Sequence, residues 1–256
     1  CTPDQLESEF QGAVDLIKYL IGILGLQDDV SYRFSRWDPK DPDKYVGNAE
    51  DWDKVETAMQ TILNDLHIDY TEAWGEAAFY GPKLDVQGKN VHGKEDTLFT
   101  VQIDFSLATR FDMIYIDENG EKARPLIIHR SSIGCYERTL AMLIEKYNGA
   151  FPMWLAPEQA RVLSLTDRTA DKAKEVRDKL FDLGLRAEAD VRSEKLGKKI
   201  REAQLDKVPY IIVIGDKEAE QNVISVRHRS EGDLGTMTVE EFVAKALLEV
   251  ATKEIK

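Results

Sequence analysis

Four runs of residues between positions 77 and 130 constrain the fold of the first half of the chain more than any other feature. They are AAFYGPKLDVQG (77–88), TLFTVQIDFSL (97–107), FDMIYIDENGE (111–121) and RPLIIHR (124–130). Alternation of apolar and polar residues is typical of strands, and Asn119-Gly120 is a strong hairpin signal. We therefore expect successive strands in an antiparallel meander, and hence an α+β fold.

Helical patterns flank these strands. Residues 2–25 open with a capping pattern at Thr2–Gln5, and residues 49–66 repeat apolar side chains at helical spacing, with a short strand expected at 31–35 between them. A further helix follows RPLIIHR and ends before Gly149. Its expected apolar stripe consists of Tyr136, Leu140, Leu143, Ile144 and Tyr147.

The pattern changes near residue 150, where we expect a domain boundary between 1–150 and 151–256. Beyond it, strand-like segments alternate with helical ones from ARVLSL (160–165) to TVEEFVAKALLEVATK (238–253). Strand–helix alternation predicts an α/β domain with a mixed, mostly parallel sheet.

Composition limits the class of protein. The chain has 256 residues, 43% hydrophobic and 32% charged, without an apolar run long enough for a membrane span. Two cysteines, Cys1 and Cys135, form no disulfide framework, so we expect a cytoplasmic protein. The net charge of -13 argues against a general nucleic-acid binder, although Arg192–Arg201 is a locally basic segment. Because the chain starts with CTPDQLE, we expect it to be processed, trimmed or a fragment.

Charged residues cluster between the strand that ends at His129 and the last helix of the first half. Arg138 could bind a phosphate or a purine face, or could be a solvated residue paired with Glu137 or Glu145. His129 could be a metal ligand or a satisfied polar residue. From the residues alone, the structural interpretation is the better one for both.

Other polar positions leave similar alternatives open. Tyr80 to Lys83 contain a proline within a strand pattern, which indicates an edge or a bulge and often neighbours a site. Gln102 and Asp104 alternate with apolar residues and face either bulk solvent or a ligand pocket. Glycine-rich phosphate loops and thiolate zinc motifs are absent from the sequence.

Seven motifs in order resemble the threonyl-tRNA synthetases, a family of class II aminoacyl-tRNA synthetases, and the resemblance extends from Cys1 almost to Lys256. The motifs are KYVGNAEDWDKVE, AAFYGPKLD, TVQIDFSL, RPLIIHRSSIGCYERTLAMLIE, GAFPMWLAPEQ, VRSEKLGKKIREAQLDKVPYIIVIGDKE and SVRHRSEGDLGTM. The sequence departs from the family's usual residues at Thr97–Phe99, Cys135, Thr139 and Ser193.

The resemblance implies an ATP-dependent threonine–tRNA ligase that uses magnesium with ATP, a catalytic zinc ion and tRNA(Thr), and that forms homodimers. In the end of the catalytic domain, it implies that Arg138 is catalytic and binds ATP. Gln102 and Thr100 then border the adenylate, Tyr80 and Lys83 bind threonine, and His129 is a zinc ligand.

In the implied anticodon-binding domain, Glu218 and Arg227 would contact anticodon bases, and Lys195, Lys199 and Arg201 would attract phosphate. The family's editing domains, its first two class II motifs and its other zinc ligands would precede Cys1. We therefore expect the C-terminal part of a longer enzyme, inactive in aminoacylation by itself. The alternative is a non-catalytic tRNA- or RNA-binding module derived from a synthetase.

Overall fold

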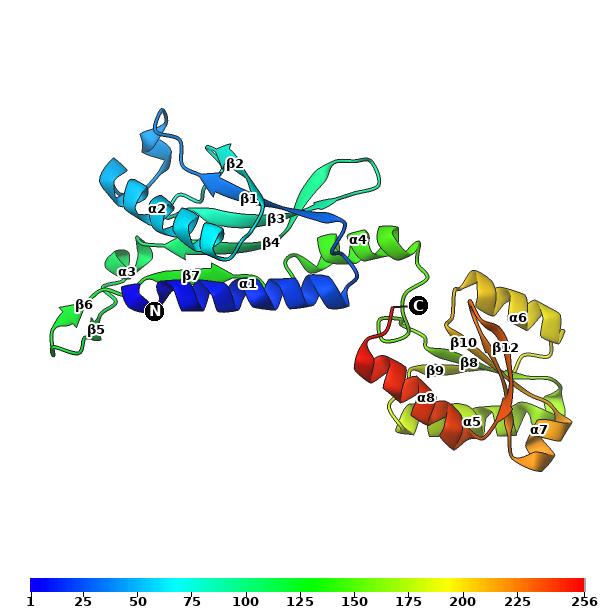
Figure 1. Cartoon of the computed structure of the whole chain (residues 1–256). Helices are drawn as coiled ribbons and strands as arrows, with labels where there is room; N and C mark the ends of the chain where they lie inside the picture. Colours follow the sequence, from blue (N-terminus) through cyan, green and yellow to red (C-terminus); the bar gives the residue numbers. More distant parts are fainter. Residues whose placement is uncertain (256) are drawn as a thin grey trace. The chain divides into compact units, whose positions relative to one another are not determined.

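A five-stranded sheet with the strand order β2-β1-β3-β4-β7 forms the centre of the first of two units (Figure 1). The structure is a computed structural model that describes residues 1–255, and the units are Cys1–Met142 and Leu143–Lys256. The strands of the first sheet are β1 (Val30–Arg36), β2 (Tyr70–Trp74), β3 (Lys83–Lys89), β4 (Glu95–Asp104) and β7 (Ile127–Arg130).

The expected meander is present in β3, β4 and β7, which pair antiparallel, as do β1 and β3. The sequence prediction missed β2, which pairs parallel to β1. Helix α2 (Ala49–Asp65) connects these two strands, and a parallel pair requires such a crossover.

One of the four predicted strands lies outside this sheet. The FDMIYIDENGE run contributes only β5 (Tyr115–Ile116), which pairs with β6 (Lys122–Ala123) in a separate two-stranded sheet. The hairpin predicted at Asn119-Gly120 does connect these strands. Arg124 holds this hairpin to the short helix α3 (Leu107–Arg110) by donating to the carbonyl oxygens of Ala108 and Met113, both at 3.2 Å.

The first sheet has one apolar and one polar face. Phe34, Leu84, Val101 and Ile103 alternate inward and are almost completely buried. Helix α1 (Leu6–Ile23), preceded by a 3-10 turn at Pro3–Gln5, lies against β4 and β7, and Gly12, Ala13 and Leu16 share a cavity with Ile128. The intervening residues of the strands carry the polar side chains.

Helix α4 (Tyr136–Tyr147) follows β7, as expected, but the predicted apolar stripe is only partly buried: Leu143 is 6% exposed, as predicted, whereas three other members are exposed. Tyr136, Leu140 and Ile144 are 74%, 53% and 47% exposed, whereas Thr139 and Met142 are buried. The Thr139 hydroxyl donates to the carbonyl of Ile133 at 2.7 Å, so a polar residue faces inward to hold the loop before the helix.

The second unit is the expected α/β domain, with a mixed sheet in the order β12-β11-β10-β8-β9. β8 (Ala160–Ser164), β9 (Ala187–Asp190) and β10 (Tyr210–Ile214) are parallel, whereas β11 (Ile224–His228) and β12 (Gly232–Met237) continue antiparallel. The helices are α5 (Ala170–Asp182), α6 (Leu196–Leu205), α7 (Asp216–Gln221) and α8 (Val239–Thr252).

The helices cover the two faces of this sheet unequally. α5 and α8 bury one face, where Tyr210, Ile212, Val226 and Phe242 form part of the core. On the other face, α6 packs against Leu163 and Ile211. The residues of β11 on that face, Ser225 and Arg227, remain half-exposed. Within residues 1–255, no helix combines the length and apolar character needed to cross a membrane.

Candidate active site and RNA-binding face

The polar face of the first sheet carries most of the residues predicted to bind substrate. Strand register places Lys83 beside Gln102 and Gln102 beside His129, in one row across β3, β4 and β7. Paired residues of adjacent strands point to the same face. Thr100 and Asp104 lie two residues to either side of Gln102 and therefore share that face.

His129 is oriented by a buried carboxylate. Its Nε2 lies 2.8 Å from Oδ2 of Asp104, which is fully buried. The other oxygen, Oδ1, accepts from the backbone N–H groups of Ser106 and Leu107 at 2.8 and 2.9 Å. When Nε2–H donates to Asp104, the neutral imidazole presents a lone pair on Nδ1. This arrangement suits a metal ligand, because carboxylates commonly orient ligating histidines.

The described residues do not form a complete metal site by themselves. No group of three or more His, Cys, Asp or Glu side chains suited to one ion occurs in the part that the structure describes. His129 therefore fits a zinc site as a single ligand, and further ligands would have to come from outside residues 1–255.

Tyr80 joins the row from the segment before β3. Its hydroxyl donates to Oε1 of Gln102, and its ring centroid lies 5.2 Å from that of His129. Burial, assisted by the Asp104 carboxylate, raises the pKa of the Tyr80 phenol, which therefore stays a neutral donor. β3 begins only at Lys83, and Tyr80 lies in a tight turn from Ala78 to Gly81 that precedes the strand.

Lys83 and Thr100 complete the polar face. Nζ of Lys83 lies 3.3 Å from Oδ2 of Asp85, which accepts a 2.6 Å hydrogen bond from Ser35. The Thr100 hydroxyl is buried and has no hydrogen-bond partner among the described residues. A buried hydroxyl without a partner is costly unless a ligand or water satisfies it, so the polar face is suited to ligand binding.

Arg138 lies in the first turn of α4, and the loop before that helix is held against β4. Gly134 has a φ of +69°, and a Cβ on it would lie only 1.8 Å from the carbonyl oxygen of Leu98. Nη1 of Arg138 donates to the carbonyl of Thr97 at 2.5 Å, and the side chain remains exposed. One donor of five thus fixes the guanidinium, while the others can contact an anion.

In the second unit, Glu218 and Arg227 flank the open part of the α6 face. Glu218 Oε1 accepts from Ser225 Oγ at 2.8 Å, and Oε2 accepts from the Gly215 backbone N–H at 3.0 Å. Against the effect of burial, these hydrogen bonds hold the pKa of the Glu218 carboxyl below its usual value. Arg227 sits at a β-bulge between β11 and β12, with Nη1 3.9 Å from Asp233 Oδ2. Bulges often aim a side chain at a site.

The basic segment divides into exposed and buried residues. Lys195 and Arg201 are exposed, and Lys195 lines a cavity of about 370 Å³ with Ser193 and Arg192. Lys199, in contrast, is 1% exposed, so the expectation that it attracts phosphate is wrong. Its ammonium donates to Ser164 O, Ser164 Oγ and Asp190 O at 3.0, 3.1 and 3.2 Å, joining the ends of β8 and β9.

Three residues of these sites were not identified from the sequence. Asp104 was noted only as part of a polar face, and Asp85 and Ser225 were not considered. The period-two pattern could have indicated Asp85, because it shares the polar face of β3 with Lys83. Ser225 shares its face of β11 with Arg227 for the same reason.

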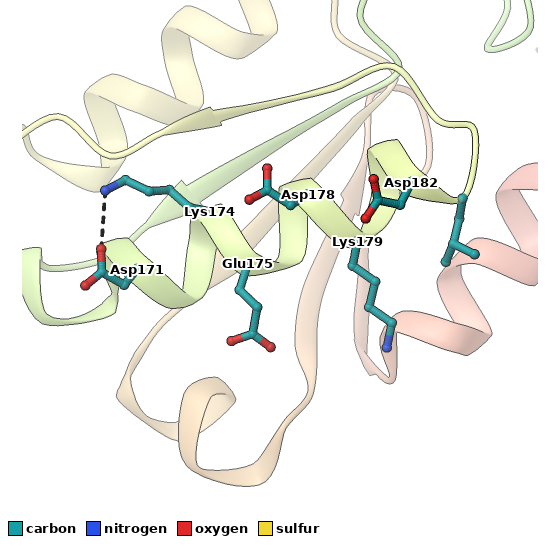
Figure 2. Close-up of a pocket in the computed structure, with 7 residues that line it drawn as sticks. Asp171, Lys174, Glu175, Asp178, Lys179 and Asp182 are labelled. Atoms are coloured by element: carbon teal, nitrogen blue, oxygen red, sulfur yellow. Dashed lines mark hydrogen bonds and ion pairs between the residues drawn. The ribbon is translucent and has the colours of Figure 1, made fainter.

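A separate depression of about 580 Å³ runs along α5 (Figure 2). Lys174 Nζ lies 3.3 Å from Asp171 Oδ1 within it, whereas Glu175, Asp178 and Lys179 pair with residues outside the depression. Alternating charges on a solvated helix are typical of surface ion pairs, which contribute little. This depression therefore adds no candidate site.

Comparison with known proteins identifies the class to which this fold and these residues belong. The family described as "tRNA synthetase class II core domain (G, H, P, S and T)" matches residues 1–147, and "Anticodon binding domain" matches residues 159–249. The chain belongs to the class II tRNA synthetase core family and includes an anticodon-binding domain.

Within that class, the chain is similar to threonine–tRNA ligases. It is 60% identical over 254 residues to the threonine–tRNA ligase of Clostridium perfringens, covering 99% of this chain and 40% of that protein. The crystal structure of the RNA-binding domain of threonyl-tRNA synthetase from Cryptosporidium parvum matches with a TM-score of 0.89 and 32% identity. That match covers 97% of this chain and 62% of the other.

A putative threonyl-tRNA synthetase from Aeropyrum pernix matches with a TM-score of 0.73 and 27% identity, covering 98% of this chain and 60% of that one. The chain thus spans about 40% of the length of the curated relatives.

Proposed function

We propose that the chain is the C-terminal part of a threonine–tRNA ligase. The complete protein forms threonyl-adenylate and pyrophosphate from threonine and ATP, with magnesium accompanying the ATP, and then transfers threonine to tRNA(Thr). The observation that carries this proposal is the row Lys83, Gln102 and His129, joined by Tyr80, on the polar face of a class II sheet. The chain supplies one side of the active site and the anticodon-binding domain.

Tyr80, Lys83, Gln102 and Thr100 form the amino-acid and adenylate side of this site. The Tyr80 hydroxyl orients the amide of Gln102 by donating to Oε1, which leaves the amide N–H groups to donate to a substrate oxygen. Lys83 supplies a cation beside the threonine pocket, and the Thr100 hydroxyl has a free hydrogen-bonding capacity that a ligand can use. Fixed donors of this kind act by orienting substrate and stabilising developing charge.

His129 contributes one ligand to a zinc site that other parts of the longer protein complete. Bound zinc would accept the amino group and hydroxyl of threonine, and so reject valine, which an apolar pocket separates poorly. Asp104 supports the role of His129 by holding Nε2 and leaving Nδ1 available.

Arg138 is the proposed catalytic cation. A guanidinium that is already anchored to Thr97 loses little freedom when it binds the nucleotide, and its permanent charge suits the negative charge that develops as pyrophosphate leaves. In the second unit, Glu218 and Arg227 offer an acceptor and a donor to anticodon bases, while Lys195 and Arg201 attract phosphate. A cytoplasmic homodimer is the assembly that we propose for the complete protein.

Metal content of the longer protein tests the site most directly. We expect His129→Ala to lower bound zinc and to reduce discrimination between threonine and valine in amino-acid-dependent ATP–pyrophosphate exchange. His92→Ala is the matched control, because His92 is exposed in the loop between β3 and β4. Equal zinc content in the two variants would refute the role of His129.

The isolated chain gives a second test. These 256 residues should bind the anticodon stem–loop of tRNA(Thr) but catalyse no threonine-dependent ATP–pyrophosphate exchange. Measurable exchange by the isolated chain would contradict the division of the site between this part and the rest of the protein.

A further inference from the structure

Glu218 is anchored through both of its carboxylate oxygens. Ser225 Oγ donates to Oε1 at 2.8 Å from β11, and the Gly215 N–H donates to Oε2 at 3.0 Å from the start of α7. Each carboxylate oxygen can accept about two hydrogen bonds. Two anchors therefore leave the carboxylate able to accept from a ligand, while they restrict its rotation.

Gly215 leaves the space that this conformation needs. A Cβ on Gly215 would lie 2.7 Å from Glu218 Oε2 and 3.1 Å from Leu165 Cδ2. A side chain there would push the carboxylate away, so the folded-back position of Glu218 depends on a glycine at this turn.

Ser225 connects Glu218 to the strand that carries Arg227. The two β11 residues are two positions apart and point to the same face of the sheet, opposite Val213 and Ile211 of β10. Both are half-exposed, in contrast to the buried Ile224, Val226 and His228 of the other face. The hydroxyl of Ser225 thus fixes an acceptor from α7 beside a donor from β11.

On this basis we infer that Ser225 is a positioning residue for base discrimination, holding the Glu218 carboxylate in the orientation that selects its anticodon base. The inference rests on the proposed contact between Glu218 and RNA. Discrimination by hydrogen bonding requires a fixed acceptor, because a mobile carboxylate can turn to accommodate a wrong base. Ser225 contributes through Glu218 and needs no contact with RNA itself.

Binding of synthetic stem–loops to the full 256-residue chain tests the inference. The probes are the tRNA(Thr) anticodon stem–loop and versions with each anticodon base replaced in turn. We expect Ser225→Ala to weaken binding of the unaltered stem–loop about 3- to 10-fold, the usual effect of one lost hydrogen bond. The loss of discrimination should fall at the same anticodon position as in Glu218→Gln. Ser225→Thr, which keeps the hydroxyl, should restore both.

A double-mutant cycle separates positioning from a general structural effect. In the Glu218→Ala background, Ser225→Ala should change binding by less than about twofold, because the carboxylate that Ser225 holds is then absent. Thr236→Ala, directly opposite Ser225 on β12, should leave discrimination unchanged.

Two different failures can be told apart. If Glu218→Gln leaves binding unchanged, the proposed role of Glu218 in RNA binding fails. If Glu218→Gln has its effect but Ser225→Ala is silent, or acts equally in both backgrounds or no more than Thr236→Ala, the inference about Ser225 is overturned.

Discussion

Gly134→Ala should destabilise the first unit by much more than the same change at another left-handed glycine. Gly134 and Gly120 have φ of +69° and +78°. A Cβ on Gly134 would lie 1.8 Å from the carbonyl oxygen of Leu98, whereas nothing lies within 4 Å of a Cβ on Gly120. The two positions therefore share the backbone penalty and differ in the steric one.

The magnitude follows from these contacts. A non-glycine residue in the left-handed region costs about 1–2 kcal/mol, which is the whole cost expected for Gly120→Ala. At Gly134 the loop must also retreat from β4 by roughly 1.7 Å to reach an ordinary separation of about 3.5 Å. Such overpacking adds about 1–3 kcal/mol, so Gly134→Ala should cost about 2–5 kcal/mol. The same retreat stretches the hydrogen bond from Arg138 to Thr97.

Urea unfolding followed by tryptophan fluorescence measures the difference. Trp37, Trp52 and Trp74 lie in the first unit, and only Trp154 lies in the second. With a slope of about 2 kcal/mol per molar urea, the midpoint should fall by about 1–2.5 M for Gly134→Ala and by about 0.5–1 M for Gly120→Ala. Equal losses would refute the argument that close contact with Leu98 fixes this loop.

Three further predictions concern Arg138, Lys199 and His228. In the longer protein, Arg138→Ala should slow ATP–pyrophosphate exchange about 100-fold or more, and an unchanged rate would exclude the catalytic role. Lys199→Met should destabilise the second unit by about 1–3 kcal/mol in urea unfolding, because three acceptors lose their donor, whereas Lys198→Met on the exposed side should have no measurable effect. Burial, opposed by Glu231 and Glu249, lowers the pKa of His228 below its ordinary 6.5. The unfolded chain therefore takes up a proton that the folded chain resists, and stability falls as the pH drops below 6.5. His228→Gln should flatten this loss in urea midpoints measured down to about pH 5.5, and an unaltered pH profile would contradict the assignment.

Alternation of apolar and polar residues predicted β3, β4 and β7 because it reflects the two faces of a sheet, and the Asn119-Gly120 turn signal predicted the hairpin. The sequence of β2 shows no such alternation. This segment, YTEAW, has mostly exposed or half-exposed residues, and its place in the sheet depends on the α2 crossover. The FDMIYIDENGE run was predicted to be a strand of the main sheet from its pattern of apolar residues. Its apolar residues Met113, Ile114 and Ile116 are instead exposed.

Charged residues were harder to place than strands. Lys199 belongs to a basic run that is typical of a solvated helix, and only its helical spacing from Leu196 and Ala203 distinguishes it locally from Lys198. Its burial depends on hydrogen bonds to the carbonyl groups of Ser164 in β8 and Asp190 in β9. Likewise the carboxylate that orients His129 comes from Asp104, 25 residues earlier, and only the β4–β7 register brings the two together.

Strand β4 sets the relative positions of the proposed substrate-binding residues. Two glycine segments dock on its backbone: Gly81, where a Cβ would lie 1.7 Å from the carbonyl oxygen of Ile103, and Gly134, which meets Leu98. The first segment carries Tyr80 and the second leads to Arg138, while Gln102 lies on β4 between the contacts. A one-residue slip of β4 would turn Gln102 to the apolar face and separate it from Tyr80 and His129. The geometry of the proposed site is therefore a property of sheet register, and close glycine–carbonyl contacts near both ends of the strand oppose such a slip.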